Sequence, residues 1–260
     1  MRRRLLQEDY SPSRPDSPYY KHHTEMDTIT ILSTALLPIA LLVYYIYHKD
    51  KKSPEPTGQL IKAFFFGILS IPLSLCISTP LGLIGAFPEE ASSIWGGIST
   101  AFFGAAIPEE IAKFIMLWLF LRKNPHFDEK MDGIVYAVCV SLGFAALENV
   151  AYLFSYADTY LSVGISRAIF AVPGHFCFGI LMGYYYSLAK FYPKAPKKNK
   201  ALILIAPIIV HGLYDAILFV TNITPAISGL LTVVFLVFCY KMWKYGSKRI
   251  AEHLNRDNVI

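Results

Sequence analysis

Seven long apolar stretches, joined by short polar segments, restrict what this chain can fold into. Of its 260 residues 54% are hydrophobic and only 17% are charged, whereas a soluble domain carries about 25% charged residues. An α-helix crosses the roughly 30 Å hydrocarbon layer of a bilayer with about 20 apolar residues. The sequence therefore predicts an all-α fold, a polytopic transmembrane helix bundle of about seven spans. The expected spans are Ile29–Tyr47, Leu60–Leu81, Trp95–Phe120, Gly133–Phe154, Val163–Leu188, Leu202–Thr221 and Ala226–Trp243.

Basic residues alternate along the connections between these spans. The segments after the first, third, fifth and seventh spans contain several Lys or Arg residues, and those after the second, fourth and sixth contain none. Because cytoplasmic loops carry the excess of Lys and Arg, we expect the N-terminus outside and the C-terminus in the cytoplasm. Basic residues placed beside membrane spans suit contact with membrane lipid, and no basic patch indicates nucleic acid.

The polar ends of the chain set the expected domain boundaries. Residues 1–27 are rich in Ser, Pro and charged residues, a composition typical of a disordered N-terminal tail. The first apolar run begins only near Ile29, too far from the start for a signal peptide. We expect one transmembrane domain over residues 28–245, followed by a cytoplasmic C-terminal tail over residues 246–260.

Ionisable and amide side chains lie well inside four of the predicted spans. Each charged residue near the centre of a membrane helix costs about 2.5–3.5 kcal/mol on insertion scales. Counted at 1.5 Å per residue from the basic end of each span, five of these side chains lie about 15–22 Å deep, namely Glu109, Glu148, His175, His211 and Asp215. Such agreement in depth predicts that they share one site. They are Glu109, Glu110 and Lys113, then Glu148 and Asn149, then His175, and finally His211 and Asp215.

The chain contains an internal comparison for one of these motifs. Pro-Glu-Glu occurs at residues 88–90 in a short loop and again at residues 108–110 inside the third span. Proline followed by acidic residues is a common helix start, which explains the first copy. The second copy is flanked by apolar residues, where Pro108 must disturb the helix. We therefore expect Glu109 and Glu110 to be functional and Glu89 and Glu90 to be dispensable.

Spacing along single helices predicts further contacts. Lys113 lies one turn after Glu109 and should be its charge partner. Asp215 lies four residues after His211 on the same helical face, where its carboxylate can orient the imidazole. Arg167, near the outer end of the fifth span, is expected to extend to the lipid headgroups. A buried polar network that serves only to pack the helices remains an alternative for all of these residues.

Five motifs resemble those of the PrsW family of intramembrane proteases, over roughly residues 95–220. They are Pro-Glu-Glu-Ile-Ala-Lys ending at Lys113, Phe-Asp-Glu-Lys-Met-Asp-Gly ending at Gly133, Gly-Phe-Ala-Ala-Leu-Glu-Asn ending at Asn149 with Tyr152, Pro-Gly-His ending at His175 with Gly179 and Gly183, and His-Gly-Leu-Tyr-Asp ending at Asp215. The resemblance implies a transmembrane protease domain in a bacterial plasma membrane. Its founding member cuts a single-pass anti-sigma factor, so the implied partner is a single-pass membrane protein substrate. A more distant similarity to CAAX prenyl endopeptidases departs at Lys113 and Asp215, so prenyl-protein processing is not expected.

The resemblance also implies which residues carry the reaction. Glu109, Glu110 and His175 would be essential, with His211 close behind. Peptide hydrolysis needs a base for water and a group that stabilises the oxyanion. A glutamate can be the base, and an imidazole or the Asn149 amide can stabilise the oxyanion.

Two questions stay open at the level of sequence. His175, His211 and Glu110 could form a three-ligand zinc site, but a metal-free glutamate mechanism fits the residues equally well, and no other cofactor is expected. An ion- or proton-coupled transporter, which also uses Glu and His residues at the membrane midplane, is the alternative function.

Overall fold

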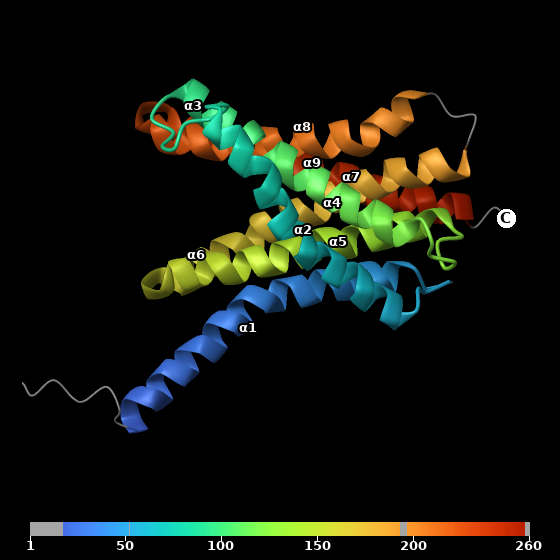
Figure 1. Ribbon diagram of the computed structural model, residues 1–260, viewed down its shortest axis with the longest axis horizontal. Helices are drawn as coiled ribbons and strands as arrows, with labels where there is room; N and C mark the ends of the chain where they lie inside the picture. Colours follow the sequence, from blue (N-terminus) through green and yellow to red (C-terminus); the bar gives the residue numbers. More distant parts are fainter. Residues whose placement is uncertain (1–17, 52, 193–196, 258–260) are drawn as a thin grey trace, which may run out of the picture.

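The chain folds into long helices packed side by side (Figure 1). The computed structural model describes residues 18–51, 53–192 and 197–257, and every regular element in these ranges is helical. The elements are α1 Pro18–Lys49, α2 Thr57–Leu83, α3 Ile94–Ser99, the π-helix η1 Thr100–Ala106, α4 Ile107–Leu121, α5 Lys130–Ser155, η2 Ala157–Thr159, α6 Tyr160–Ile169, α7 Ala171–Phe191, α8 Lys197–Ile223, η3 Pro225–Ile227 and α9 Ser228–Asp257.

Six helical segments of the described chain are long and apolar enough to cross a membrane. They coincide with six of the seven predicted spans, which confirms the helical membrane bundle. The predicted span Trp95–Phe120 is helical as well, but it consists of α3, η1 and α4 in direct succession. Pro108 lies in the first turn of α4 and lacks an N–H to donate to the preceding turn. The chain widens into a π-helix just before it, a feature that often marks functional sites.

The predicted terminal tails are only partly within the described residues. Residues 1–17 and 258–260 lie outside them, and α1 begins at Pro18. At the other end α9 continues without a break to Asp257, and Ile250 and His253 in its last turns are buried. The Asp257 carboxylate accepts hydrogen bonds from the backbone N–H groups of Lys130 and Met131, at 3.1 and 2.9 Å. Residues 246–257 are therefore a packed part of the bundle.

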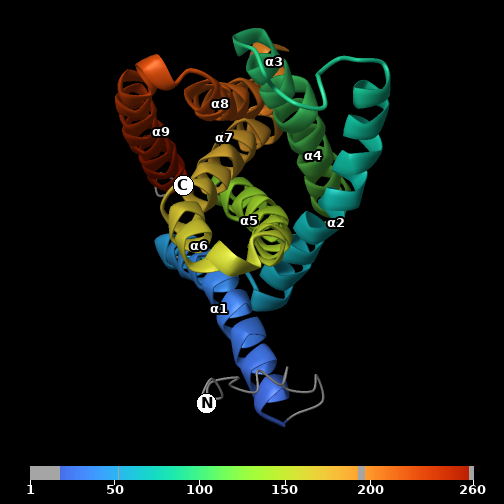
Figure 2. The same ribbon diagram turned by 90° about the vertical axis from the view of Figure 1, so that its left-hand side faces the viewer.

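Helix α5 is the central element of the bundle, with α1, α2, α4, α6 and α7 around it (Figure 2). Most of its side chains are buried. Small residues allow membrane helices to approach closely, and the two tightest crossings both use glycine. A Cβ at Gly183 of α7 would meet the backbone of Gly133, and one at Gly143 would meet the backbone of Phe64 in α2. These contacts fix α7 and α2 against α5, and α7 carries His175.

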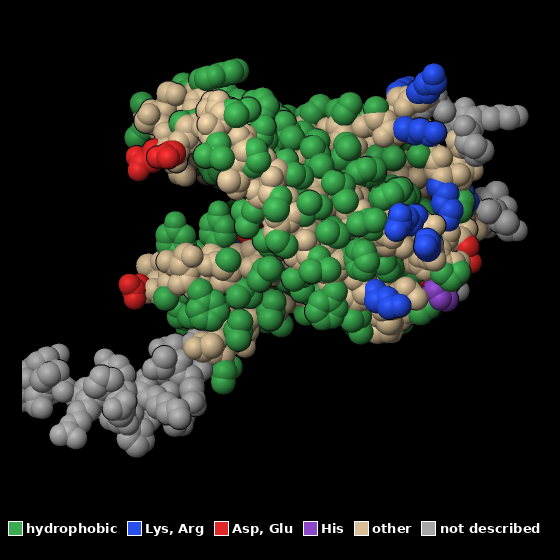
Figure 3. Space-filling view, in the orientation of Figure 1, with side chains coloured by type: hydrophobic (Ala, Val, Ile, Leu, Met, Phe, Trp, Pro, Cys, Tyr) green, Lys and Arg blue, Asp and Glu red, His purple; other side chains and the backbone are tan. Residues whose placement is uncertain are grey.

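Charge separates the two ends of the bundle, as the loop pattern predicts. Lys and Arg side chains gather at the end that carries the α1–α2 connection, where acidic side chains also lie, whereas the charged side chains visible at the other end are acidic (Figure 3). We refer to these as the basic end and the opposite end. The molecule is hollowed at the opposite end, between the part that carries α3 and the part that carries α6. The direction of the bundle in a membrane remains a prediction from the loop charges.

Candidate active site

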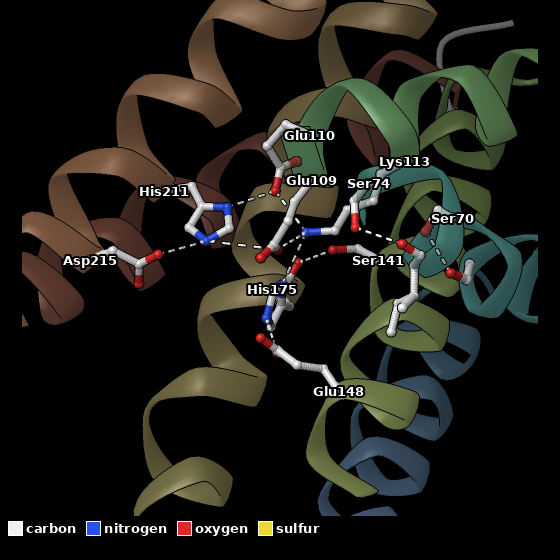
Figure 4. A network of polar contacts seen from close by, with 12 residues as sticks. Ser70, Ser74, Glu109, Glu110, Lys113, Ser141, Glu148, His175, His211 and Asp215 are labelled. Atoms are coloured by element: carbon white, nitrogen blue, oxygen red, sulfur yellow. Dashed lines mark hydrogen bonds and ion pairs between the residues drawn. The ribbon is translucent and has the colours of Figure 1, made fainter. Parts of the chain in front are cut away.

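The polar residues predicted from four spans meet inside the bundle (Figure 4). They form one connected set of hydrogen bonds and ion pairs, which we call the polar network. Its members are Glu109, Glu110 and Lys113 of α4, Glu148 of α5, His175 of α7, and His211 and Asp215 of α8. This arrangement agrees with the expectation that the similar depth of these residues reflects one shared site.

Lys113 occupies the centre of the polar network. Its Nζ lies 2.8 Å from Glu110 Oε1, 3.2 Å from Glu109 Oε2 and 3.2 Å from His175 Nδ1. The side chain is 1% exposed, and its ammonium also lies 4.1 Å from the centre of the Phe144 ring. An ammonium has three protons and no lone pair, so these three partners use all of them. The predicted pairing of Lys113 with a carboxylate is confirmed, and it includes both glutamates.

The contact with Lys113 determines the tautomer of His175. Since an ammonium can only donate, His175 Nδ1 must accept and its proton must lie on Nε2. Nε2 lies 3.0 Å from Glu148 Oε2, which accepts that proton in a hydrogen bond. The hydroxyl of Ser141 donates to the His175 backbone carbonyl at 2.6 Å. The imidazole is therefore held in one orientation by neighbours on α4 and α5.

His211 is held between carboxylates. Its Nδ1 lies 2.9 Å from Glu110 Oε1, and its Nε2 lies 3.2 Å from Asp215 Oδ2 and 4.0 Å from Glu109 Oε2. The ring stacks on Phe178 with 4.4 Å between centroids. The predicted orientation of His211 by Asp215 is confirmed.

Arg167 belongs to this site, and the expectation that it reaches the lipid headgroups is wrong. Its Nη2 donates to Glu148 Oε2 at 2.6 Å, and its Nε donates to Asn149 Oδ1 at 2.6 Å. Its guanidinium also lies 4.1 Å from the centre of the Tyr152 ring. An internal carboxylate offers a stronger partner than the headgroup region because the pair is shielded from water. The connections after the second, fourth and sixth spans contain no Lys or Arg, so a lone Arg167 next to one of them was a signal for an internal partner.

Asn149 lies next to the site and connects it to α1. Besides binding Arg167, its amide donates to the Ala35 backbone carbonyl of α1 at 3.1 Å, and the residue is 1% exposed. Both ends of the amide are thus occupied, and Asn149 is not among the residues that line the neighbouring cavity. This arrangement links α1, α5 and α6, and gives no support to Asn149 as the oxyanion group.

A cavity of about 270 Å³ adjoins the polar network. Among the residues that line it are Glu109, Glu148, Arg167, His175, His211, Tyr214 and Asp215. The two adjacent glutamates differ here, because the Glu109 side chain is 15% exposed and lines the cavity, whereas that of Glu110 is 1% exposed and does not. Glu89 and Glu90, by contrast, lie exposed in the α2–α3 connection. Of the two Pro-Glu-Glu motifs, only the second reaches the site.

Two groups of side chains in the described part of the chain have ligand atoms close enough to hold a metal ion. Glu109, Glu110 and His211 form one group, and Glu109, Glu148 and His175 form the other, each within 4.8 Å. The sequence predicted a zinc site of His175, His211 and Glu110. Their ligand atoms do not form such a group, because Lys113 lies between Glu110 and His175. Among the described residues Glu110 Oε2 is buried without a hydrogen-bond partner. Two carboxylates and an imidazole with a spare acceptor fit the ligand preference of zinc.

This helical membrane bundle encloses a cavity that is lined by carboxylates and imidazoles. These are the groups that hydrolysis of a peptide bond inside the membrane requires. Comparison with known proteins agrees with this class. The family model described as PrsW family intramembrane metalloprotease matches residues 55–242. The chain belongs to the PrsW family and is an intramembrane protease.

Curated relatives cover most of the chain. It is 32% identical to Protease PrsW of Clostridioides difficile (strain 630) over 229 residues, which is 87% of this chain and 92% of that protein. It is 33% identical to Protease PrsW of Bacillus subtilis (strain 168), over 85% of this chain and 94% of that protein. Protease PrsW of Oceanobacillus iheyensis is 33% identical over 86% of this chain and its own full length. No solved structure matches the chain. The bacterial relatives and the apolar helices define a multi-pass bacterial membrane protein, and the transporter alternative gains no support.

Proposed function

We propose that this protease cuts a single-pass membrane protein, with Glu109 as the base that activates water. The observation that carries the proposal is the contrast between the two adjacent glutamates. Glu109 lines the cavity while Glu110 is enclosed by Lys113 and His211. A base must reach the water from which it takes a proton, and Glu109 is the member of the pair in that position.

The groups around the cavity can then divide the reaction between them. Glu109 takes a proton from a water molecule as the water oxygen bonds to the peptide carbonyl carbon. An N–H group of His211, which also lines the cavity, can stabilise the negative charge that develops on the carbonyl oxygen. Protonated Glu109 returns the proton to the nitrogen as the C–N bond breaks. Lys113 and Glu110 hold Glu109 and His211 in place throughout.

Whether the site holds a metal ion depends on some of the same residues. Zinc held by Glu109, Glu110 and His211 would supply a Lewis acid for the scissile carbonyl, and in that form of the site Glu109 would serve as a ligand and not as the base. The family description names a metalloprotease, and the ligand atoms of this group fit such an ion. His175, which contacts Glu148 and Lys113, is not a member of this group.

The substrate class follows from the surroundings of the cavity. Phe170, Phe178 and Phe235 are among its apolar lining residues, so an unwound membrane segment finds both apolar contacts and water-activating groups there. We propose a single-pass substrate of the anti-sigma factor type, whose cleavage would release a regulated factor.

The decisive experiment compares two matched glutamate pairs in purified protein. Cleavage of a panel of single-pass substrates should fall at least about 100-fold in Glu109→Gln, the usual contribution of a general base. Glu110→Gln should also be inactive, while Glu89→Gln and Glu90→Gln cut at the wild-type rate. Near-normal cleavage by Glu109→Gln would refute the assigned base. Loss of activity with a chelator and its recovery with zinc would establish the metal-bound form of the site, and resistance to the chelator would establish the metal-free form.

A further inference from the structure

Tyr214 of α8 differs from the other polar residues that line the catalytic cavity. The residue is part of the cavity wall, yet its hydroxyl is buried and has no hydrogen-bond partner among the described residues. Arg167 and His211, which line the same cavity, are held by partners within the chain. A buried tyrosine hydroxyl normally has a hydrogen-bond partner, because an unpaired one lowers the stability of the fold. The Tyr214 hydroxyl therefore needs an explanation other than folding.

The ring of Tyr214, in contrast to its hydroxyl, is firmly packed. It meets the rings of Phe178 and Phe235 edge-on, with 5.9 and 4.9 Å between centroids, and the residue is 4% exposed. Its Cζ, the carbon that bears the hydroxyl, lies 3.6 Å from the position that a Cβ of Gly174 would take. Gly174 directly precedes His175, so the hydroxyl end of the ring lies beside the turn that carries this histidine. A phenylalanine would make the same ring contacts, so packing does not require the hydroxyl.

The polar groups of the cavity are rich in hydrogen-bond acceptors. Glu109, Glu148 and Asp215 line it, and an ionised carboxylate can only accept. A peptide segment that is unwound inside a membrane exposes both N–H and C=O groups, and each of them needs a partner there. The carboxylates can pair with its N–H groups, so donors are needed for its carbonyls. A phenol O–H that has no acceptor within the described chain is such a donor.

We propose that Tyr214 is a substrate-binding residue whose hydroxyl donates a hydrogen bond to a backbone carbonyl of the unwound substrate, next to the scissile bond. This inference rests on the proposed function, in which His211 serves the scissile carbonyl itself. Tyr214 follows His211 by three residues on α8, so the two side chains share a face of the helix and both line the cavity. A donor to the backbone recognises an extended segment regardless of its side chains, so Tyr214 would favour unwinding of the substrate without selecting its sequence.

Tyr214→Phe tests this role, because it removes the hydroxyl and keeps the ring. With the single-pass substrate that the wild-type protein cuts fastest, we expect KM to rise about 3- to 10-fold while kcat changes little. The free energy of unfolding should stay at the wild-type value, because the hydroxyl has no partner in the fold. The matched control is Tyr136→Phe, whose lost hydroxyl donates to Glu55 away from the cavity. This control should lower the stability and leave KM unchanged. A wild-type KM for Tyr214→Phe, or the same rise in both variants, would overturn the proposal.

A binding measurement tests the same contact without turnover. The probe is a dye-labelled peptide of the membrane segment of that substrate, bound to protein that carries Glu109→Gln. Adding Tyr214→Phe should raise the Kd about 3- to 10-fold. Peptides with an ester in place of one amide weaken one carbonyl acceptor at a time. At the carbonyl that Tyr214 binds, the effects of the ester and of Tyr214→Phe should not add, and additive effects at every position would refute the contact. Cleavage by Glu109→Gln bears on the assigned base and the KM of Tyr214→Phe bears on Tyr214, so the two proposals fail separately.

Discussion

Single residues in this site act through the contacts that they make with one another. Glu148 illustrates the point, since one of its oxygens, Oε2, accepts from both Arg167 and His175. Arg167 on α6 thereby keeps Glu148 in position as the acceptor that holds the Nε2–H tautomer of His175. Mutation of a residue that orients a catalytic or metal-binding histidine in this way usually lowers activity or metal affinity about 10- to 100-fold.

We predict that Arg167→Gln lowers kcat about 10- to 100-fold by releasing Glu148, with a smaller effect on KM. Arg167→Lys, which keeps the charge but loses the second hydrogen bond to Asn149, should recover part of the rate. The measurement is steady-state cleavage of a purified substrate across pH. The control is Arg122→Gln, an exposed arginine that lies over the Trp118 ring. A wild-type kcat for Arg167→Gln would contradict this role.

At the scale of elements, the close crossings of α5 determine where the functional helices lie. Gly183 and Gly133 bring the backbones of α7 and α5 together, and the hydroxyl of Ser187 donates to the Lys130 carbonyl at 2.8 Å in the same seam. His175 lies two turns before Gly183 on α7. A change in this crossing would therefore displace the imidazole from Glu148 and Lys113.

We predict that Gly183→Ala destabilises the protein by about 1–3 kcal/mol, the usual cost of overpacking a tight core. The reason is that its Cβ would meet the backbone of Gly133 and Ile134, which a rotamer change cannot relieve. Gly58→Ala is the control, because no atom lies within 4 Å of a Cβ at that position. Denaturant-induced unfolding in mild detergent measures both variants. Equal stability of the two would mean that α7 and α5 are held by other contacts.

At the scale of the whole molecule, the separation of charge makes a prediction about direction in the membrane. The basic end should face the cytoplasm, which places the C-terminus there and the hollowed end outside. Reporter fusions after Lys123, Lys198 and Ile260 should report a cytoplasmic location, and a fusion after Ser92 should report the outside. Two or more fusions with the reverse result would show that the bundle is inserted the other way.

The sequence by itself determined the helical bundle, the depth of the polar residues and their pairing along single helices. Apolar length fixes a membrane span, a constant rise of 1.5 Å per residue fixes depth, and spacing of four residues fixes a shared face. For this reason the pairs of Lys113 with Glu109 and of His211 with Asp215 could be predicted. Only the tertiary structure decided how each helix is rotated about its axis and which faces meet.

That rotation separates Glu109, which lines the cavity, from Glu110, which is buried behind it, although the two are adjacent in the chain. It also directs Arg167 inward to Glu148 and turns the Asn149 amide toward α1. The contact of Lys113 with His175 likewise joins helices that lie far apart in sequence. Such contacts depend on how side chains of different helices pack against one another, which no periodicity within a single helix encodes.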